Sequence, residues 1–254
     1  MRLKSLIKTE KSFVTQVIIV FIILALIPVI SHGEFFVSTL CLSVIWAIMG
    51  IGWNVIGGYA GQVSNGHAMY FAIGAYVGAL GLKWFNMTPW VTMWVGVIIS
   101  MALAFLIGYP LLRLRGHYFA IATMAIVECV RIICTNWDLI GGATGVSFFQ
   151  RGANPLYTLQ FENRIPFYFI CLAFMLVFVI VSRVIQRSKF GYYCRAINAN
   201  QDSAESAGVN STFYKRWAYM ISAAIVSIGG ALYAQYIQYI DPVSLLPLSN
   251  SMLI

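Results

Sequence analysis

The feature that most constrains the fold of this chain is a series of long apolar stretches separated by polar connections. A helix that crosses a membrane needs about 20 predominantly apolar residues. Seven stretches meet this requirement: 13–30, 35–56, 67–85, 89–109, 118–135, 166–185 and 216–240. Lipid offers no hydrogen bonds to an exposed backbone, so spanning stretches are expected to be helical. The sequence therefore predicts an all-α polytopic transmembrane helical bundle, with residues 1–254 forming a single domain.

Composition favours lipid over water as the main solvent. Of the 254 residues, 60% are hydrophobic and only 9% are charged, whereas a soluble domain carries about 25% charged residues. The net charge of +8 comes from short basic clusters between apolar stretches, and no nucleic-acid partner is expected from such a pattern. The five cysteines and three histidines lack metal-ligand spacing, so no metal site is predicted.

The distribution of basic residues predicts the orientation of the bundle. With the N-terminus in the cytoplasm, the inside segments are 1–12, 57–66, 110–117 and 186–215 with its flanks. Twelve of the 16 Lys and Arg residues then lie inside, and three (Lys83, Arg151 and Arg164) lie outside. Because inside loops carry an excess of positive charge, this arrangement is favoured. The first apolar stretch is interpreted as an uncleaved span, since no small-residue cleavage site follows it.

Two glycine-rich segments have similar sequences. Residues 53–61 read W-N-x-I-G-G-x-x-G, and residues 137–145 read W-D-x-I-G-G-x-x-G. Three predicted spans separate them, which places the copies on opposite sides of the membrane and indicates an inverted repeat with discontinuous segments. The alternative is two ordinary turns, in which glycine supplies a positive φ and Ser64 or Asn65 caps a helix. The candidate translocation-path residues are Gly57, Gly58, Gly61, Gln62, Ser64, Asn65, His67, Gly141, Gly142, Thr144 and Gly145.

Glu128 and Arg131 are ionisable residues in the middle of a predicted span. Charges at that depth are costly, and they are candidates for function. Spaced at i and i+3, they also lie on one face of a helix, where each can pair with the other. A structural ion pair and a role in gating or substrate passage therefore both remain open. The predicted spans contain no other acid for a proton relay.

The connection 186–215 is predicted to contain two short helices. Asn200 or Asp202 can cap the second helix, with Glu205 in its first turn and Gly208 at its end. A compact cytoplasmic element of this kind suits the docking of another protein. An interfacial helix lying on lipid headgroups is the alternative.

Three parts of the sequence resemble the LivM-type permeases of branched-chain amino-acid ABC importers. They are the glycine segment 57–67 with 74–76, the segment 112–145 through Glu128 and Arg131, and the segment 195–232. The resemblance covers most of residues 35–240 in the family's order. Asn65 departs from the family, whose members more usually carry a small or apolar residue there. Family members also continue with further helices, and residues 249–254 read as the start of another apolar segment.

The resemblance implies that the connection 186–215 docks into a cleft of an ATP-binding subunit. It gives the coupling positions as Arg195, Asn198, Asp202, Ala204, Glu205 and Gly208. It further implies a permease subunit in a bacterial-type inner membrane. Its partners would be two ATP-binding subunits, a second permease subunit, an extracytoplasmic binding protein and membrane lipid.

The chain contains no GxxxxGK[ST] segment, so we expect no ATPase site, no enzymatic activity and no cofactor of its own. A permease for urea or short amides on the same scaffold is one alternative to branched-chain amino-acid transport. An ion-driven secondary amino-acid transporter is another alternative, although such a transporter is expected to have more acidic residues within its membrane spans.

Overall fold

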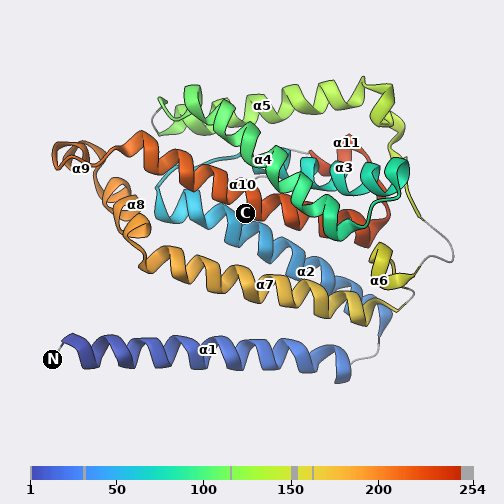
Figure 1. Ribbon diagram of the computed structural model, residues 1–254, viewed down its shortest axis with the longest axis horizontal. Helices are drawn as coiled ribbons and strands as arrows, with labels where there is room; N and C mark the ends of the chain where they lie inside the picture. The colour runs from blue at the N-terminus through green and yellow to red at the C-terminus, as the bar shows by residue number, and fades with distance from the viewer. Residues whose placement is uncertain (1, 31–32, 115, 150–153, 162, 247–254) are drawn as a thin grey trace.

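The computed structural model describes residues 2–30, 33–114, 116–149, 154–161 and 163–246, and in these ranges six helices are long and apolar enough to span a membrane. They are α2 (Glu34–Asn54) with its extension η1 (Val55–Tyr59), α3 (His67–Phe85), α4 (Pro89–Leu111), α5 (His117–Thr135), α7 (Arg164–Arg187) and α10 (Ser211–Ile237). The helices run roughly along the long axis of the molecule (Figure 1). Each overlaps one predicted stretch, which confirms an all-α polytopic bundle.

The remaining predicted stretch, 13–30, lies in α1 (Arg2–Ile30), which runs along one edge of the bundle (Figure 1). Its described apolar part, Ser12–Pro28, is shorter than the six spans. The hydroxyl of Tyr168 in α7 donates a hydrogen bond to the carbonyl of Leu24 at 2.9 Å. The guanidinium of Arg183 lies 4.2 Å from the centroid of the Phe13 ring. Helix α1 is therefore a peripheral helix that packs against α7.

Helix α10 is the central element and packs against α2, α3 and α4. Its close approach to α3 depends on glycine. A β-carbon added at Gly74 would overlap the carbonyl oxygen of Ser227, and one added at Gly230 would overlap the carbonyl oxygen of Phe71. Small residues that bring backbones together are the usual means by which membrane helices associate. Gly78, by contrast, leaves an ordinary gap of 3.7 Å to the β-carbon of Ala231.

Short elements close the two ends of the bundle. One end carries α8 (Lys189–Ala199) and α9 (Gln201–Ser206). Toward the other end lie η2 (Asp138–Ile140), η3 (Gly142–Thr144), α6 (Pro155–Thr158) and α11 (Pro242–Leu245), together with β1 (Val146–Ser147) and β2 (Tyr239–Ile240). The two strands pair antiparallel, with Val146 opposite Ile240. The two glycine segments thus lie at opposite ends of the bundle (Figure 1).

The helix boundaries follow from capping. Helix α10 begins at Ser211, earlier than the predicted 216, because the Asn210 side chain accepts a hydrogen bond from the amide of Phe213 at 3.0 Å. It ends at Ile237 because Gln238 adopts a left-handed conformation with φ +60°. Residues 239–240 form β2, although the last predicted span extends to residue 240. Arg151 and the predicted apolar segment 249–254 lie outside the described residues.

The predicted inside segments gather at one end of the molecule. The first turns of α1, the connection after α2, the connection between α4 and α5, and the α8–α9 element all lie there (Figure 1). The basic clusters of the sequence are therefore concentrated at a single end, as the orientation prediction requires.

Candidate functional site

The first glycine segment leaves α2 through a π-helical turn, η1, and continues without regular secondary structure at residues 61–66. Such turns are rare and occur frequently at functional sites. Gly57 and Gly58 lie within the π turn. Gly61 bends the chain with φ +69°, a conformation that costs other residues about 1–2 kcal/mol. The segment is thus a helix interruption of the kind the sequence predicts.

The irregular part, residues 61–66, is held against the neighbouring helices by hydrogen bonds between its backbone and their side chains. The indole Nε1 of Trp53 donates to the carbonyl of Ser64 at 2.8 Å. The amide of Asn65 donates to Thr123 Oγ1 in α5 at 3.1 Å. Gln62 and Ser64 are buried, whereas Val63 is exposed. These bonds satisfy polar backbone groups that lipid would leave unpaired.

A chain of hydrogen bonds then connects the start of α3 to the centre of the bundle. His67 is fully buried, and its Nε2 lies 2.7 Å from Ser222 Oγ in α10. The Ser222 hydroxyl donates its proton to the carbonyl of Gly52 in α2 at 2.7 Å, so it accepts the bond from His67 Nε2–H. Ser222 lies about 16 Å along α10 from Ser211, at 1.5 Å per residue. The glycine segment therefore re-enters the bundle to about mid-length of α10.

Aromatic rings enclose the His67 side chain. Its ring centroid lies 6.0 Å from that of Tyr70 and 6.1 Å from that of Tyr219, both in edge geometry. Phe119 of α5 packs on Tyr219 at 6.1 Å. Ser64 and His67, predicted as path residues, thus face the protein interior, where they anchor the segment. Gly61 and Asn65 keep partial exposure, and their role in a path stays a prediction.

We expect Ser222→Ala to lower the stability of the folded chain by about 1–3 kcal/mol, because it leaves the buried Nε2–H of His67 and carbonyl of Gly52 without this hydrogen-bond partner. Ser100→Ala is the matched control. Ser100 is equally buried in α4, but its hydroxyl has no hydrogen-bond partner among the described residues. Thermal unfolding in detergent should show a lower Tm for Ser222→Ala alone. Equal Tm values for the two variants would contradict the assigned hydrogen-bond chain.

The second glycine segment also follows a spanning helix, α5, but its local structure differs from that of the first. It forms two 3-10 turns, in which Thr144 Oγ1 donates to the carbonyl of Gly141 at 2.8 Å. The hydroxyl of Tyr239 donates to the carbonyl of Thr144 at 2.8 Å. Gly145 has φ +72°, close to the +69° of Gly61 at the matching position. Gly141 and Gly142 also have positive φ, whereas their counterparts in the first segment are helical.

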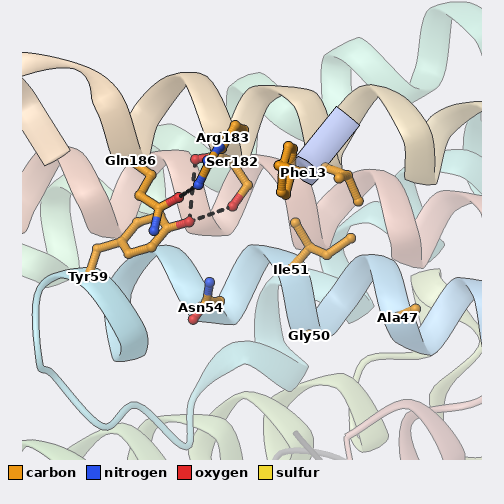
Figure 2. A pocket seen from close by; sticks show the side chains of 10 residues that line it. Phe13, Ala47, Gly50, Ile51, Asn54, Tyr59, Ser182, Arg183 and Gln186 are labelled. Carbon is orange, nitrogen blue, oxygen red and sulfur yellow. Dashed lines mark hydrogen bonds between the residues drawn. The ribbon is translucent and has the colours of Figure 1, made fainter. Parts of the chain in front are cut away.

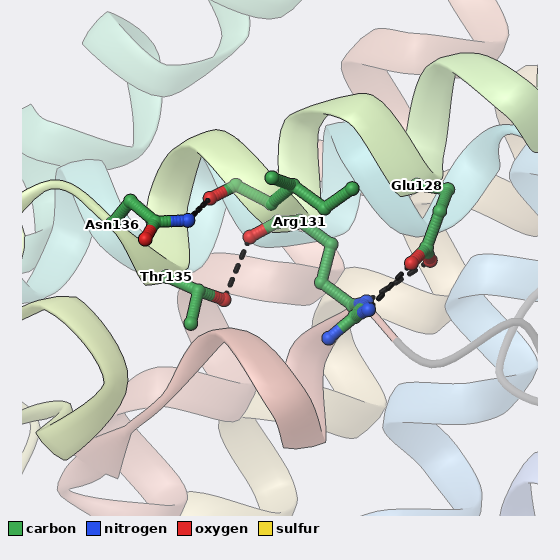
Figure 3. Close-up of polar contacts among 5 residues, drawn as sticks. Glu128, Arg131, Thr135 and Asn136 are labelled. Carbon is green, nitrogen blue, oxygen red and sulfur yellow. Dashed lines mark hydrogen bonds and ion pairs between the residues drawn. The ribbon is translucent and has the colours of Figure 1, made fainter.

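Glu128 and Arg131 form an ion pair within α5 (Figure 3). Arg131 donates to both carboxylate oxygens, from Nε to Oε2 at 3.0 Å and from Nη2 to Oε1. Both side chains are about a third exposed, on the most weakly buried of the six spans. The geometry fits the structural ion pair, while a role in gating stays a prediction. Thr135 closes the next turn with a bond to the carbonyl of Arg131 at 2.8 Å.

The predicted pair of short helices is present as α8 and α9. Asn200 is the cap of α9 and accepts a hydrogen bond from the amide of Ser203 at 2.9 Å. The sequence predicted Glu205 in the first turn of this helix, but α9 begins at Gln201, so Glu205 lies beyond that turn. Its carboxylate accepts a hydrogen bond from the Ser211 hydroxyl. Gly208 ends the element with φ +85°.

Most of the predicted coupling positions lie on the surface of this element. Arg195, Asn198, Asp202, Glu205 and Gly208 are exposed, whereas Ala204 is buried.

The buried face of α8 includes Cys194, and burial raises the pKa of its thiol to about 12. The thiol is therefore neutral and serves as packing.

Asn198 connects the α8–α9 element to the first glycine segment. Its Nδ2 donates to the carbonyl of Gly58 in η1 at 3.0 Å. Its side chain also lies so close to Gly61 that a β-carbon at Gly61 would overlap Asn198 Oδ1. Two regions predicted to have separate roles, coupling and translocation, are thus in direct contact.

Comparison with known proteins identifies the family. The model of the branched-chain amino acid transport system permease component matches residues 35–253. The chain belongs to this permease family. It is 29% identical over 239 residues to the high-affinity branched-chain amino acid transport system permease protein LivM of Salmonella typhimurium, an alignment that covers 85% of the chain and 55% of that relative. The Escherichia coli K12 LivM is 29% identical over 237 residues, with the same coverage.

A probable branched-chain amino acid transport permease protein LivM of Methanocaldococcus jannaschii is 26% identical over 147 residues, covering 56% of this chain and 42% of that relative. The chain therefore spans about half the length of the relatives that it matches. No solved structure gives a significant match. Family membership and the six apolar helices together establish a multi-pass membrane protein of the permease type.

Sequence reasoning missed the residues that anchor the first glycine segment. Trp53 appeared only as part of the repeat, and Thr123 and Ser222 were single polar residues within apolar stretches. A lone hydroxyl in a predicted span gives no sign of its partner. Only the packing of α5 and α10 against the segment reveals their roles.

Proposed function

We propose that this chain is the membrane-spanning permease subunit of an ABC importer for branched-chain amino acids. An extracytoplasmic binding protein delivers leucine, isoleucine or valine, and two ATP-binding subunits power transport. A second permease subunit completes the membrane part. The chain lies in a bacterial-type inner membrane with its N-terminus in the cytoplasm, and ATP is bound by the partner subunits only.

The observation that carries this proposal is that the α8–α9 element, in a chain of the permease family, is hydrogen-bonded to both flanking spanning helices, α7 and α10. Arg195 Nη2 donates to the carbonyl of Gln186 near the end of α7 at 3.1 Å. Lys215, buried at the start of α10, donates to Gln201 Oε1 of α9 at 2.6 Å. A force applied to α9 therefore reaches the central helix directly, as a docking element for an ATP-binding subunit requires.

The substrate class rests on the relatives, two of which carry the name of high-affinity branched-chain amino acid permeases. Apolar side chains need only a modest apolar pocket, whereas the ammonium and carboxylate of an amino acid need polar groups or helix ends. The helix interruptions at the two glycine segments are the candidates for that role.

The docking assignment is tested with two exposed alanines at opposite ends of the bundle, Ala207 after α9 and Ala143 in η3. Ala207→Arg adds a bulky charge to the proposed docking face without removing an internal side-chain bond. We expect it to abolish co-purification with the ATP-binding subunits, while Ala143→Arg retains them. If Ala207→Arg co-purifies as well as the wild type, the α8–α9 element is not the docking site.

A further inference from the structure

A groove lies between α1, α2 and α7 (Figure 2). It has a volume of about 410 Å³ and is lined by Phe13 of α1, by residues of α2 and η1, and by residues of α7. The family model begins at residue 35, so α1, which forms one wall, lies outside the matched region. The groove is therefore not made by the family's matched residues alone.

The two longer walls of the groove change from apolar to polar in the same direction. Along α2 the lining passes from Ala47 and Ile51 to Asn54 and then Tyr59 in η1. Along α7 it passes from Val179 to a polar group formed by Ser182, Arg183 and Gln186. Helices α2 and α7 run in the same direction, toward the end that carries α8 and α9 (Figure 1). The groove is thus amphiphilic, with its polar part nearest that end.

The polar part is arranged around the guanidinium of Arg183. Tyr59 and Ser182 share a hydrogen bond of 2.8 Å between their hydroxyls. Arg183 Nη1 donates to Gln186 Oε1 at 2.6 Å, and its guanidinium stacks on the Phe13 ring. None of the described side chains that line the groove is acidic. In sequence, the first turns of α1 carry Lys8, Glu10 and Lys11, α7 ends at Arg187, and α8 begins at Lys189.

Arg183 lies about 6 Å from the end of α7 at Arg187, at 1.5 Å per residue. A long basic side chain near the end of a spanning helix can reach the headgroup boundary of a bilayer, and basic pockets between membrane helices recognise anionic headgroups. We propose that the groove binds an anionic phospholipid, whose phosphate contacts Arg183 and the neighbouring hydroxyls. The first part of an acyl chain lies along Ala47, Ile51 and Val179. The rest of the lipid extends along the exposed apolar faces of α1 and α7, which include Ile18 and Val177.

Native mass spectrometry of the full chain, titrated with phosphatidylglycerol or phosphatidylcholine, tests the proposal. We expect preferential retention of phosphatidylglycerol by the wild type. Arg183→Gln should weaken this retention about tenfold or more, the usual effect of losing a charge-assisted bond to phosphate. Arg113→Gln is the matched control, because Arg113 also stacks on an aromatic ring, Tyr109, but lies outside the groove. It should retain the lipid as the wild type does.

A second variant fills the groove without changing its charge. Gly50 lines the groove, and a β-carbon there meets nothing within 4 Å, so Gly50→Leu should fold normally and exclude the lipid. Equal retention by Arg183→Gln and Arg113→Gln, or full retention by Gly50→Leu, would overturn the proposal. So would displacement of phosphatidylglycerol by excess inorganic phosphate, which would mark a site for small anions.

Discussion

Gly74→Ala is expected to destabilise the folded chain by about 3 kcal/mol, the upper part of the range for overpacked interiors. The added methyl group would overlap the carbonyl oxygen of Ser227, which is part of the α10 backbone and has no rotamer to change. Helices α3 and α10 would have to separate, and the contacts along the most extensive interface among the described helices would weaken. A lower Tm and a smaller monodisperse fraction in size-exclusion chromatography would report the loss.

Gly78→Ala provides the control for this result. It lies one turn further along α3, and the helix-propensity gain from glycine to alanine, about 1 kcal/mol, is the same at both positions. Its added methyl group would meet the β-carbon of Ala231 at an ordinary distance of 3.7 Å. Gly78→Ala should therefore be as stable as the wild type or more so. If both variants lose stability equally, the close approach of α3 and α10 at Gly74 is wrong.

Gly61→Ala is expected to reduce ATP-dependent leucine uptake at least about tenfold while the chain still inserts into the membrane. The change forces alanine into φ +69°, at about 1–2 kcal/mol, and pushes against Asn198 Oδ1. Helix α8 would be displaced from η1, which breaks the contact between the coupling element and the re-entrant segment. Uptake by vesicles that contain the complete transporter measures the effect, and this prediction rests on the proposed function.

Two further variants separate the contact with Asn198 from simple backbone strain. Gly116→Ala also places alanine at a positive φ, +58°, but nothing lies within 4 Å of the added carbon, so uptake should fall much less. The double variant Gly61→Ala with Asn198→Ala removes the overlap and should recover part of the uptake. Similar uptake by Gly61→Ala and Gly116→Ala would show that the Asn198 contact has no part in coupling.

Much of the fold could be predicted from the sequence because spanning helices depend on local hydropathy and length. The stretches 67–85 and 118–135 match α3 and α5 almost residue for residue. The end of α10 could not be predicted in this way. Residues 239–240 are apolar enough to continue a helix, but they pair with β1, a partner far away in the sequence.

The candidate site was predictable where its contacts are local. The spacing of Glu128 and Arg131 indicated their ion pair, and Asn200 was one of two residues expected to cap α9. The contact between His67 and Ser222 joins residues 155 positions apart, and it depends on how α3 packs on α10. The burial of His67 depends on the same packing, so a polar residue after a glycine segment did not reveal whether it faces a path or the core.

We propose that this permease moves branched-chain amino acids under the power of separate ATP-binding subunits. The most direct test is uptake of radiolabelled leucine by vesicles that contain the chain with its partner permease, ATP-binding subunits and binding protein. We expect uptake that requires ATP and every partner. Excess isoleucine or valine should suppress this uptake, whereas urea should not. Leucine uptake without ATP or partners, driven by an ion gradient, would contradict this proposal.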